Sequence, residues 1–135
     1  MKKVLMAGAF DYLHWGHIQA LRKGKQIAKK INGILIVGVH TDRLYRDYKG
    51  VEAIHNFHHR VNSVKELKCV DRVVPQDTFN LLDTIKRYNV DVYALSDEWV
   101  HTKKEEFKYM KVKGKKIVII PRFKETSSTK MKESL

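Results

Sequence analysis

The chain reads Gly8-Ala9-Phe10-Asp11-Tyr12-Leu13-His14-Trp15-Gly16-His17 where an apolar segment gives way to a helical pattern. Residues 4–8 have the composition of a short buried strand, and apolar residues recur with helical spacing further on, at Ile18, Leu21, Ile27, Ala28 and Ile31. His14 and His17 therefore fall at the start of a helix, where unpaired N–H groups and the helix dipole favour an anion. The pattern predicts a phosphate site without a protein nucleophile.

The histidine pair also has two other interpretations. A histidine near a strand end is commonly a hydrogen-bonded structural residue, and a pair at i and i+3 can ligate a metal. The metal interpretation lacks a following carboxylate of the His-Glu-x-x-His kind, and Cys69 is the only cysteine. A second cluster, His55, His58 and His59, has no ordered carboxylate set beside it. We expect no protein-held metal, and the structural role of the pair stays open beside the phosphate site.

Residues 8–17 resemble the signature of the cytidylyltransferase family, within the wider His-x-Gly-His nucleotidyltransferase superfamily. The likeness is specific because the motif follows the first strand and stands behind a Gly-x-Phe-Asp turn. It implies that His14 and His17 are catalytic and donate to phosphate oxygens. It also implies nucleotide-binding positions, namely Gly8, Ala9, Phe10 and Gly16.

Strand and helix patterns alternate along the rest of the chain. Residues 33–39 form an apolar run typical of a strand buried on both faces, and further strands are expected at 72–74, ending at Pro75, at 91–95 and at 116–121. Intervening helices are expected behind an Asn56 cap and over Leu81 to Tyr88, with a short last helix capped by Ser127 or Ser128. The alternation predicts one α/β domain over residues 1–135, with a doubly wound, mostly parallel five-stranded sheet. The resemblance implies that this sheet has the Rossmann-like nucleotidyltransferase fold.

Polar segments fall at the carboxyl ends of these strands, where ligands gather in doubly wound sheets. They are residues 40–42, 96–99 and 121–130. In the last of them, the forked charge of Arg122 suits phosphate oxygens, and hydroxyls precede a helix start at Ser127, Ser128 and Thr129. Such hydroxyls commonly serve only as helix caps, so the prediction of a site depends on several segments converging.

The resemblance extends from the first strand to Lys130. The family's closing motif, Arg-Thr-Glu-Gly-Ile-Ser-Thr-Thr-Lys, matches at Arg122, Ser127, Thr129 and Lys130 and departs at residues 123–126. The resemblance implies that Arg122, together with Lys49 on a mobile loop, neutralises phosphate charge. It further implies nucleotide binding at Asp71, Asp97, Glu98, Ser127, Ser128 and Thr129, and acceptor binding at Trp99, Lys130, Arg60 and Lys68.

Residues 68–74 resemble the family's Arg-Tyr-Val-Asp-Glu-Val segment, which helps to form a homodimer and reaches toward the active site. Lys68 stands in place of the arginine, which keeps the charge but loses the bidentate fork. The resemblance therefore implies a homodimer, with a mixed structural and interface role for this segment.

The reaction that the resemblance implies is cytidylyl transfer from CTP, with Mg²⁺ expected on the triphosphate. A substrate phosphate attacks the α-phosphorus, pyrophosphate leaves, and a CDP-alcohol forms. Glycerol 3-phosphate is the expected acceptor, because Lys130 and the sequence Asp97-Glu98-Trp99 match that branch and a lysine would repel a cationic head group. Choline phosphate and ethanolamine phosphate remain alternatives, since Lys49-Gly50 and Lys68 match that branch as well.

Composition leaves further classes open. The net charge of +12 and the pI near 9.8 fit attraction to nucleic acid or an acidic membrane surface. Much of that charge is dispersed over expected helix surfaces, so a non-enzymatic nucleic-acid-binding module is the less favoured interpretation. An adenylyltransferase of the same superfamily is a further alternative, although these usually carry proline where Trp15 stands. A class I tRNA synthetase fragment would need a longer chain.

The remaining composition bears on location. A chain of 135 residues with 43% hydrophobic content can bury a core. A single cysteine rules out an intrachain disulfide, and no apolar stretch approaches the length of a membrane span. We expect a cytoplasmic protein whose partners are CTP and a small phosphorylated alcohol.

Overall fold

The computed structural model describes residues 1–121. Within this range the elements are β1 (Lys2–Gly8), α1 (Trp15–Lys30), β2 (Gly33–His40), α2 (Asp42–Lys49), α3 (Phe57–Lys65), β3 (Arg72–Gln76), α4 (Leu82–Arg87), β4 (Val92–Ser96), the 3₁₀ helix η1 (Asp97–Thr102), α5 (Lys104–Val112) and β5 (Lys116–Ile120). The expected last helix and five predicted site residues, Arg122, Ser127, Ser128, Thr129 and Lys130, lie outside the described residues.

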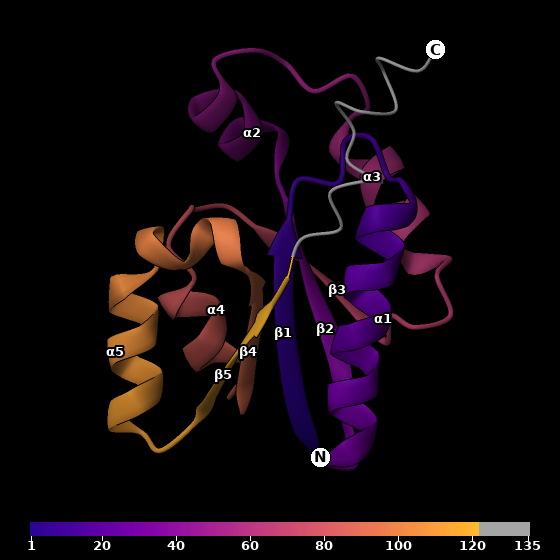
Figure 1. Cartoon of the computed structure of the whole chain (residues 1–135). Coiled ribbons are helices and arrows are strands. Elements are labelled where there is room, and N and C mark those ends of the chain that lie inside the picture. The colour runs from indigo at the N-terminus through magenta and orange to yellow at the C-terminus, as the bar shows by residue number, and fades with distance from the viewer. Residues whose placement is uncertain (122–135) are drawn as a thin grey trace.

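The five strands form one sheet in the order β3-β2-β1-β4-β5, and every neighbouring pair is parallel (Figure 1). The expected doubly wound α/β fold is confirmed, with a sheet that is entirely rather than mostly parallel. Chain order reverses between β1 and β4, which makes their carboxyl ends the switch point where such sheets bind ligands.

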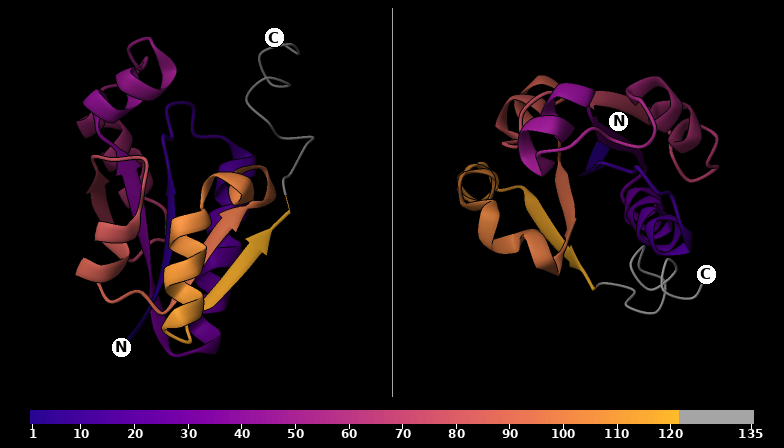
Figure 2. Two further views of the ribbon diagram at one scale, coloured as in Figure 1. Left: turned by 90° about the vertical axis from the view of Figure 1, so that its left-hand side faces the viewer. Right: turned by 90° about the horizontal axis from the view of Figure 1, so that it is seen from above.

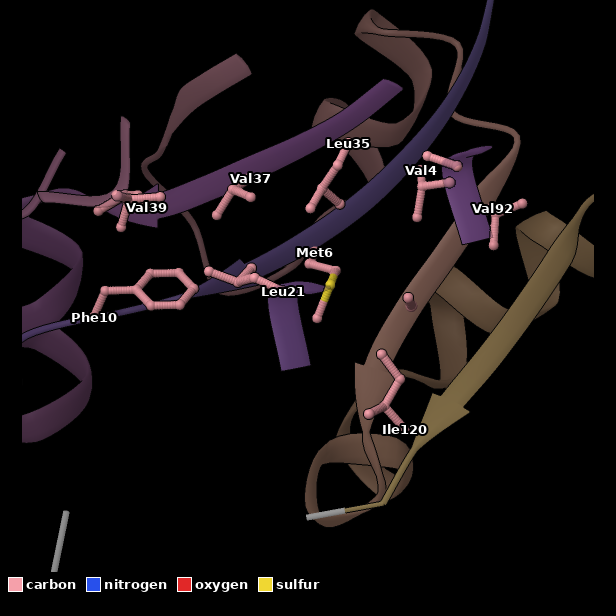
Figure 3. Packing of buried hydrophobic residues seen from close by; sticks show 12 residues of the cluster. Val4, Met6, Phe10, Leu21, Leu35, Val37, Val39, Val92 and Ile120 are labelled. Atoms are coloured by element: carbon pink, nitrogen blue, oxygen red, sulfur yellow. The ribbon is translucent and has the colours of Figure 1, made fainter. Parts of the chain in front are cut away.

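Helices cover both faces of the sheet (Figure 2). On one face, α1 and α3 bury apolar side chains against the strands, including Leu21, Ala28 and Val64. Figure 3 shows this packing, with Leu21 beside Met6 and the valines of β2. On the other face, α4 and α5 bury Ile85 and Met110. Both layers rest on β1 and β2, whose central residues are fully buried, as the apolar run at 33–39 predicted.

Three local features differ from the sequence-based prediction. β3 does not stop at Pro75 but continues to Gln76, with Val39 and Pro75 in register. Proline is tolerated there because β3 is an edge strand, whose outward side needs no N–H. Residues 42–49 form helix α2, which ends at Gly50 with φ 76°, so Lys49 closes a helix rather than lying in a loop. Residues 104–112, whose charges were expected on an exposed helix surface but for which no helix bounds were predicted, form α5.

No helix within residues 1–121 is both long enough and apolar enough to cross a membrane.

Candidate functional site

His14 and His17 form a reciprocal cap at the first turn of α1. His14 is the N-cap, and its Nδ1 accepts a hydrogen bond of 3.0 Å from the Gly16 N–H. The His14 N–H in turn donates to Nδ1 of His17 at 3.3 Å. This is the capping-box arrangement, with histidines in both roles. The predicted position of the pair at a helix start is confirmed. The same two rings cap the helix and are the candidates for contacting a phosphate.

The cap also determines which ring nitrogen carries the proton. Because each Nδ1 accepts a backbone N–H, the neutral rings hold their proton on Nε2 and act as donors there. Burial lowers the pKa of His17 to about 4, the charge of nearby His14 acts in the same direction, and a hydrogen bond with the Tyr12 backbone partly opposes the shift. Burial also lowers the pKa of His14. At neutral pH both histidines are therefore uncharged donors whose ring centroids lie 4.0 Å apart.

The turn between β1 and α1 is shaped by Phe10. This residue has φ 55°, in the left-handed region, and its ring lies edge-on to His17 with centroids 5.4 Å apart. A Cβ on Gly8 would lie 3.1 Å from the Phe10 ring, so a larger residue would press the ring out of this position by a few tenths of an ångström. Phe10 thus supports the side of the His17 imidazole, and Gly8 supports Phe10.

Asp11 fastens the same turn to the segment before α3. Its carboxylate accepts the N–H groups of Ile54 and His55, both at 2.9 Å, and the hydroxyl of Tyr45 at 3.2 Å. A carboxylate in a turn commonly bonds nearby N–H groups, but these partners lie more than 30 residues away in the sequence. Asp11 therefore holds two segments together.

Arg60 is a structural centre, which corrects its predicted role in acceptor binding. The side chain has no exposed surface. It donates to the backbone oxygens of His55, Ala9 and His40 at 2.7–2.9 Å and to the Asp42 carboxylate at 2.8 Å. Four of its five N–H donors are thus used inside the protein. The carbonyl of Ala9, a predicted nucleotide-binding residue, accepts a hydrogen bond from Arg60.

Asp71 lies at the opposite edge of the sheet from the histidines, which corrects its predicted nucleotide-binding role within this chain. It accepts hydrogen bonds of 2.7 Å from the Leu35 N–H and from Lys25. Leu35 is near the amino end of β2, whereas His40 ends that strand. Lys68, also predicted in acceptor binding, is exposed ahead of β3 at this same amino edge.

An aromatic cluster gathers three segments beyond the strand ends. We define it as Tyr48 of α2, Phe79 of the loop after β3 and Trp99 of η1. Tyr48 stacks on Phe79 with centroids 5.0 Å apart, and Trp99 lies 6.1 Å from Tyr48 and 6.2 Å from Phe79. Lys49 extends over the Tyr48 ring, with its Nζ 5.4 Å from the centroid. The structure thus brings Lys49 and Trp99, both predicted site residues, to one cluster.

The acidic pair Asp97 and Glu98 begins η1, directly after β4. Both side chains are exposed at the carboxyl edge of the sheet. They therefore lie at the end of β4, the strand that borders β1 at the switch point, as the sequence predicted.

His40 lies buried at the end of β2, beside the aromatic cluster. Its ring centroid is 6.5 Å from that of Tyr48, and its Nδ1 has no hydrogen-bond partner among the described residues. Burial lowers the pKa of His40 to about 4, and the charges of Arg60, Lys103 and Lys49 contribute to the shift. Three cations therefore lie near His40, of which Arg60 and Lys103 are themselves buried.

The second histidine cluster is a pair of stacked rings. His55 and His59 lie with centroids 4.2 Å apart and nearly parallel planes, and His58 is exposed. Residues 1–121 contain no group of three or more His, Cys, Asp or Glu side chains that could hold a metal ion.

Sequence reasoning missed Phe79 and Lys103. Phe79 could have been noticed as a lone aromatic in the polar stretch Asp77-Thr78-Phe79-Asn80, after the third strand. Lys103 stands among several lysines, and only its burial distinguishes it: 4% of its surface is exposed.

The chain is similar to proteins of known families. A family model described as cytidylyltransferase-like matches residues 5–134. The chain is 33% identical over 136 aligned residues to a glycerol-3-phosphate cytidylyltransferase of Bacillus subtilis, which covers 100% of this chain and 98% of that protein. It is 38% identical over 101 residues to an ethanolamine-phosphate cytidylyltransferase of Dictyostelium discoideum, with 73% of this chain and 27% of that protein covered.

The chain is also similar to a further relative and to a solved structure. An FAD synthase of Korarchaeum cryptofilum is 36% identical over 131 residues, with 95% of this chain and 87% of that protein covered. The solved structure of a lipopolysaccharide core biosynthesis protein from Thermoplasma volcanium superposes with a TM-score of 0.70 at 27% identity, covering 90% of this chain and 96% of that one.

The parallel sheet, with paired imidazoles at its switch point, is the architecture of an α/β nucleotidyltransferase. The chain belongs to the cytidylyltransferase-like family and is by class a nucleotidyltransferase.

Proposed function

We propose that this enzyme transfers CMP from CTP to glycerol 3-phosphate and releases pyrophosphate. The observation that carries the proposal is the reciprocal histidine cap, which places two imidazoles together at a helix N-terminus beside the switch point. The relative from Bacillus subtilis, similar over its full length, supports this acceptor.

Catalysis in this proposal consists of positioning and charge stabilisation. The acceptor phosphate attacks the α-phosphorus of CTP, the bond to the β-phosphate oxygen breaks, and pyrophosphate departs with its electron pair. His14 and His17 donate to oxygens whose negative charge grows as the reaction proceeds. The helix N-terminus adds its dipole, and the turn carrying Phe10 keeps the rings aligned.

Lys49 is the described cation proposed to neutralise phosphate charge, and Arg122 is proposed to complete this role from beyond the described residues. Lys49 ends α2 and lies over Tyr48, at the same edge of the sheet as the histidines. CTP would enter as its Mg²⁺ complex, with phosphate oxygens among the ligands of the ion. Chelation of Mg²⁺ by EDTA should abolish turnover.

A second candidate function is adenylyl transfer. The FAD synthase relative, 36% identical over 95% of this chain, favours it. The nucleotide and acceptor are therefore tested together.

The test is pyrophosphate release by the whole chain with each of four nucleoside triphosphates, Mg²⁺ and a panel of acceptors. The panel holds glycerol 3-phosphate, ethanolamine phosphate, choline phosphate and FMN. Turnover with CTP and glycerol 3-phosphate well above every other pair would support the proposal. Preference for ATP with FMN would replace it with adenylyl transfer, and absence of turnover with every pair would refute both.

We also infer a homodimer formed through residues 68–74. These residues lead into β3, which is an edge strand, and Lys68 is exposed. Sedimentation equilibrium should give twice the monomer mass of 15.8 kDa, and a monomer at micromolar concentration would contradict the inference.

A further inference from the structure

The aromatic cluster already holds a cation of the protein's own. The Nζ of Lys103 lies 3.8 Å from the centroid of the Phe79 ring, well within the range of a cation–π contact. Only 4% of Lys103 is exposed. A ring face in such a cluster is the ordinary binding place for a ligand ammonium group, and here an internal lysine occupies it.

Hydrogen bonds keep the Lys103 ammonium in this position. It donates to the backbone oxygen of Phe79 at 2.6 Å and pairs with the Glu106 carboxylate at 3.3 Å. Glu106 is held in turn by the Leu81 N–H at 3.0 Å. Because it is the ammonium group of Lys103 that contacts the ring, the Lys103–Glu106 ion pair presents its positive end to Phe79.

The cluster lies where an acceptor head group would meet the protein. Trp99 follows β4 at the switch point, and Tyr48 immediately precedes Lys49. Tyr48 is 42% exposed and Trp99 partly exposed, so both rings are accessible, while the buried Lys103 contacts Phe79, the third ring of the cluster. A second cation brought to these rings would face the charge of Lys49 and the positive end of the Lys103–Glu106 ion pair in a partly desolvated setting.

We propose that Lys103 keeps cationic head groups away from the rings of Tyr48 and Trp99, and so selects an acceptor whose head is an uncharged polyol. Lys103 acts through the rings and is a positioning residue, not a catalytic one. This inference depends on the proposed cytidylyl transfer and identifies the residue that determines its acceptor class. Repulsion between like charges is a common means of rejecting a close analogue.

The test compares acceptors rather than total activity. In Lys103→Met, the ratio of kcat/KM for ethanolamine phosphate to that for glycerol 3-phosphate should rise at least about tenfold, through a lower KM for ethanolamine phosphate. The KM for CTP should stay unchanged. Lys108→Met removes an exposed lysine from the same helix, α5, and should leave the ratio at the wild-type value.

Lys103→Met leaves Glu106 buried without its partner and is expected to lower stability. The double variant Lys103→Met with Glu106→Gln removes both charges while an amide oxygen still accepts the Leu81 N–H. It carries the same prediction if the single variant does not fold.

The outcomes separate this inference from the function on which it depends. A ratio within twofold of wild type in the folded variants would overturn the role of Lys103 and leave cytidylyl transfer intact. So would a wild-type enzyme that prefers ethanolamine phosphate. A wild-type enzyme inactive with CTP and every acceptor would instead overturn the proposed function, and this inference with it.

Discussion

At the scale of single residues, the proposed mechanism gives the histidine pair two tasks with different atoms. The Nδ1 atoms close the helix cap, and the Nε2–H groups would donate to phosphate oxygens. A substitution can therefore keep one task and lose the other. Asparagine is among the best N-cap residues, because its side-chain oxygen accepts the same N–H, but it is too short to replace an imidazole Nε2 donor.

His14→Ala should lower the free energy of unfolding by about 1 kcal/mol, the usual value of a lost N-cap. His14→Asn should restore most of that stability. Both variants should lose about 10²–10³ in kcat, the usual cost of one electrostatic donor. Urea denaturation and pyrophosphate release measure the two effects.

The same reasoning predicts that His17→Ala folds and loses most turnover. Near-wild-type kcat in His14→Asn or His17→Ala would show that the pair serves only as a cap. Recovery of stability without recovery of kcat in His14→Asn would support separate roles for the two ring nitrogens.

At the scale of elements, Arg60 of α3 connects the ends of β1 and β2 to the start of α2. It binds the carbonyls of Ala9 and His40 and the carboxylate of Asp42. Asp11 accepts the N–H groups of residues 54 and 55. Together, Arg60 and Asp11 attach the turn before His14 to the segments around α2 and α3. The site is thus held by buried polar bonds between segments.

Arg60→Met should lower the free energy of unfolding by roughly 2–4 kcal/mol, because it leaves the buried carbonyl of His40, two part-buried carbonyls and the part-exposed Asp42 carboxylate without their donor. Asn62→Met, at an exposed position of the same helix, should change it by less than about 0.5 kcal/mol. Equilibrium unfolding in urea compares the two variants. Equal, small effects would refute the structural role assigned to Arg60.

The order and type of the elements could largely be predicted from sequence, because helix and strand periods are local. The five strands were found within one or two residues, and Asn56 caps α3 as expected. Helix α2 and helix α5 were missed because charged and aromatic residues fill both, which obscures an apolar stripe. The third strand was predicted to end at Pro75 because proline is disfavoured inside a sheet. Only the tertiary fold shows that this strand lies at the edge of the sheet, where proline is tolerated.

At the scale of the whole molecule, two buried histidines make stability depend on pH. The pKa of both His17 and His40 is lowered to about 4 in the folded protein, against 6.5 for an unburied ring. Above pH 6.5 neither state binds protons at these rings. As the pH falls from 6.5 to 4, the unfolded chain takes up protons that the folded chain does not, so unfolding becomes easier.

Each of these histidines should therefore cost about 2 kcal/mol of stability between pH 7 and pH 5. Urea denaturation at the two pH values measures the loss. His40→Gln should reduce the pH-dependent loss by about half, while His58→Gln, at an exposed ring, should leave it unchanged. A wild-type stability that is flat between pH 7 and pH 5 would contradict this prediction.

The sequence by itself determined the alternation of strands and helices and the position of His14 and His17 at a helix start, because both follow from spacing along a short stretch of chain. Only the tertiary structure decided which charged residues are available to a ligand. Arg60, Asp71 and Lys103 look alike in the sequence as charged residues, yet each is committed to partners far along the chain or buried with them. Buried polar groups form hydrogen bonds with whichever groups the fold places next to them. The spacing of residues along the sequence does not show which groups these are.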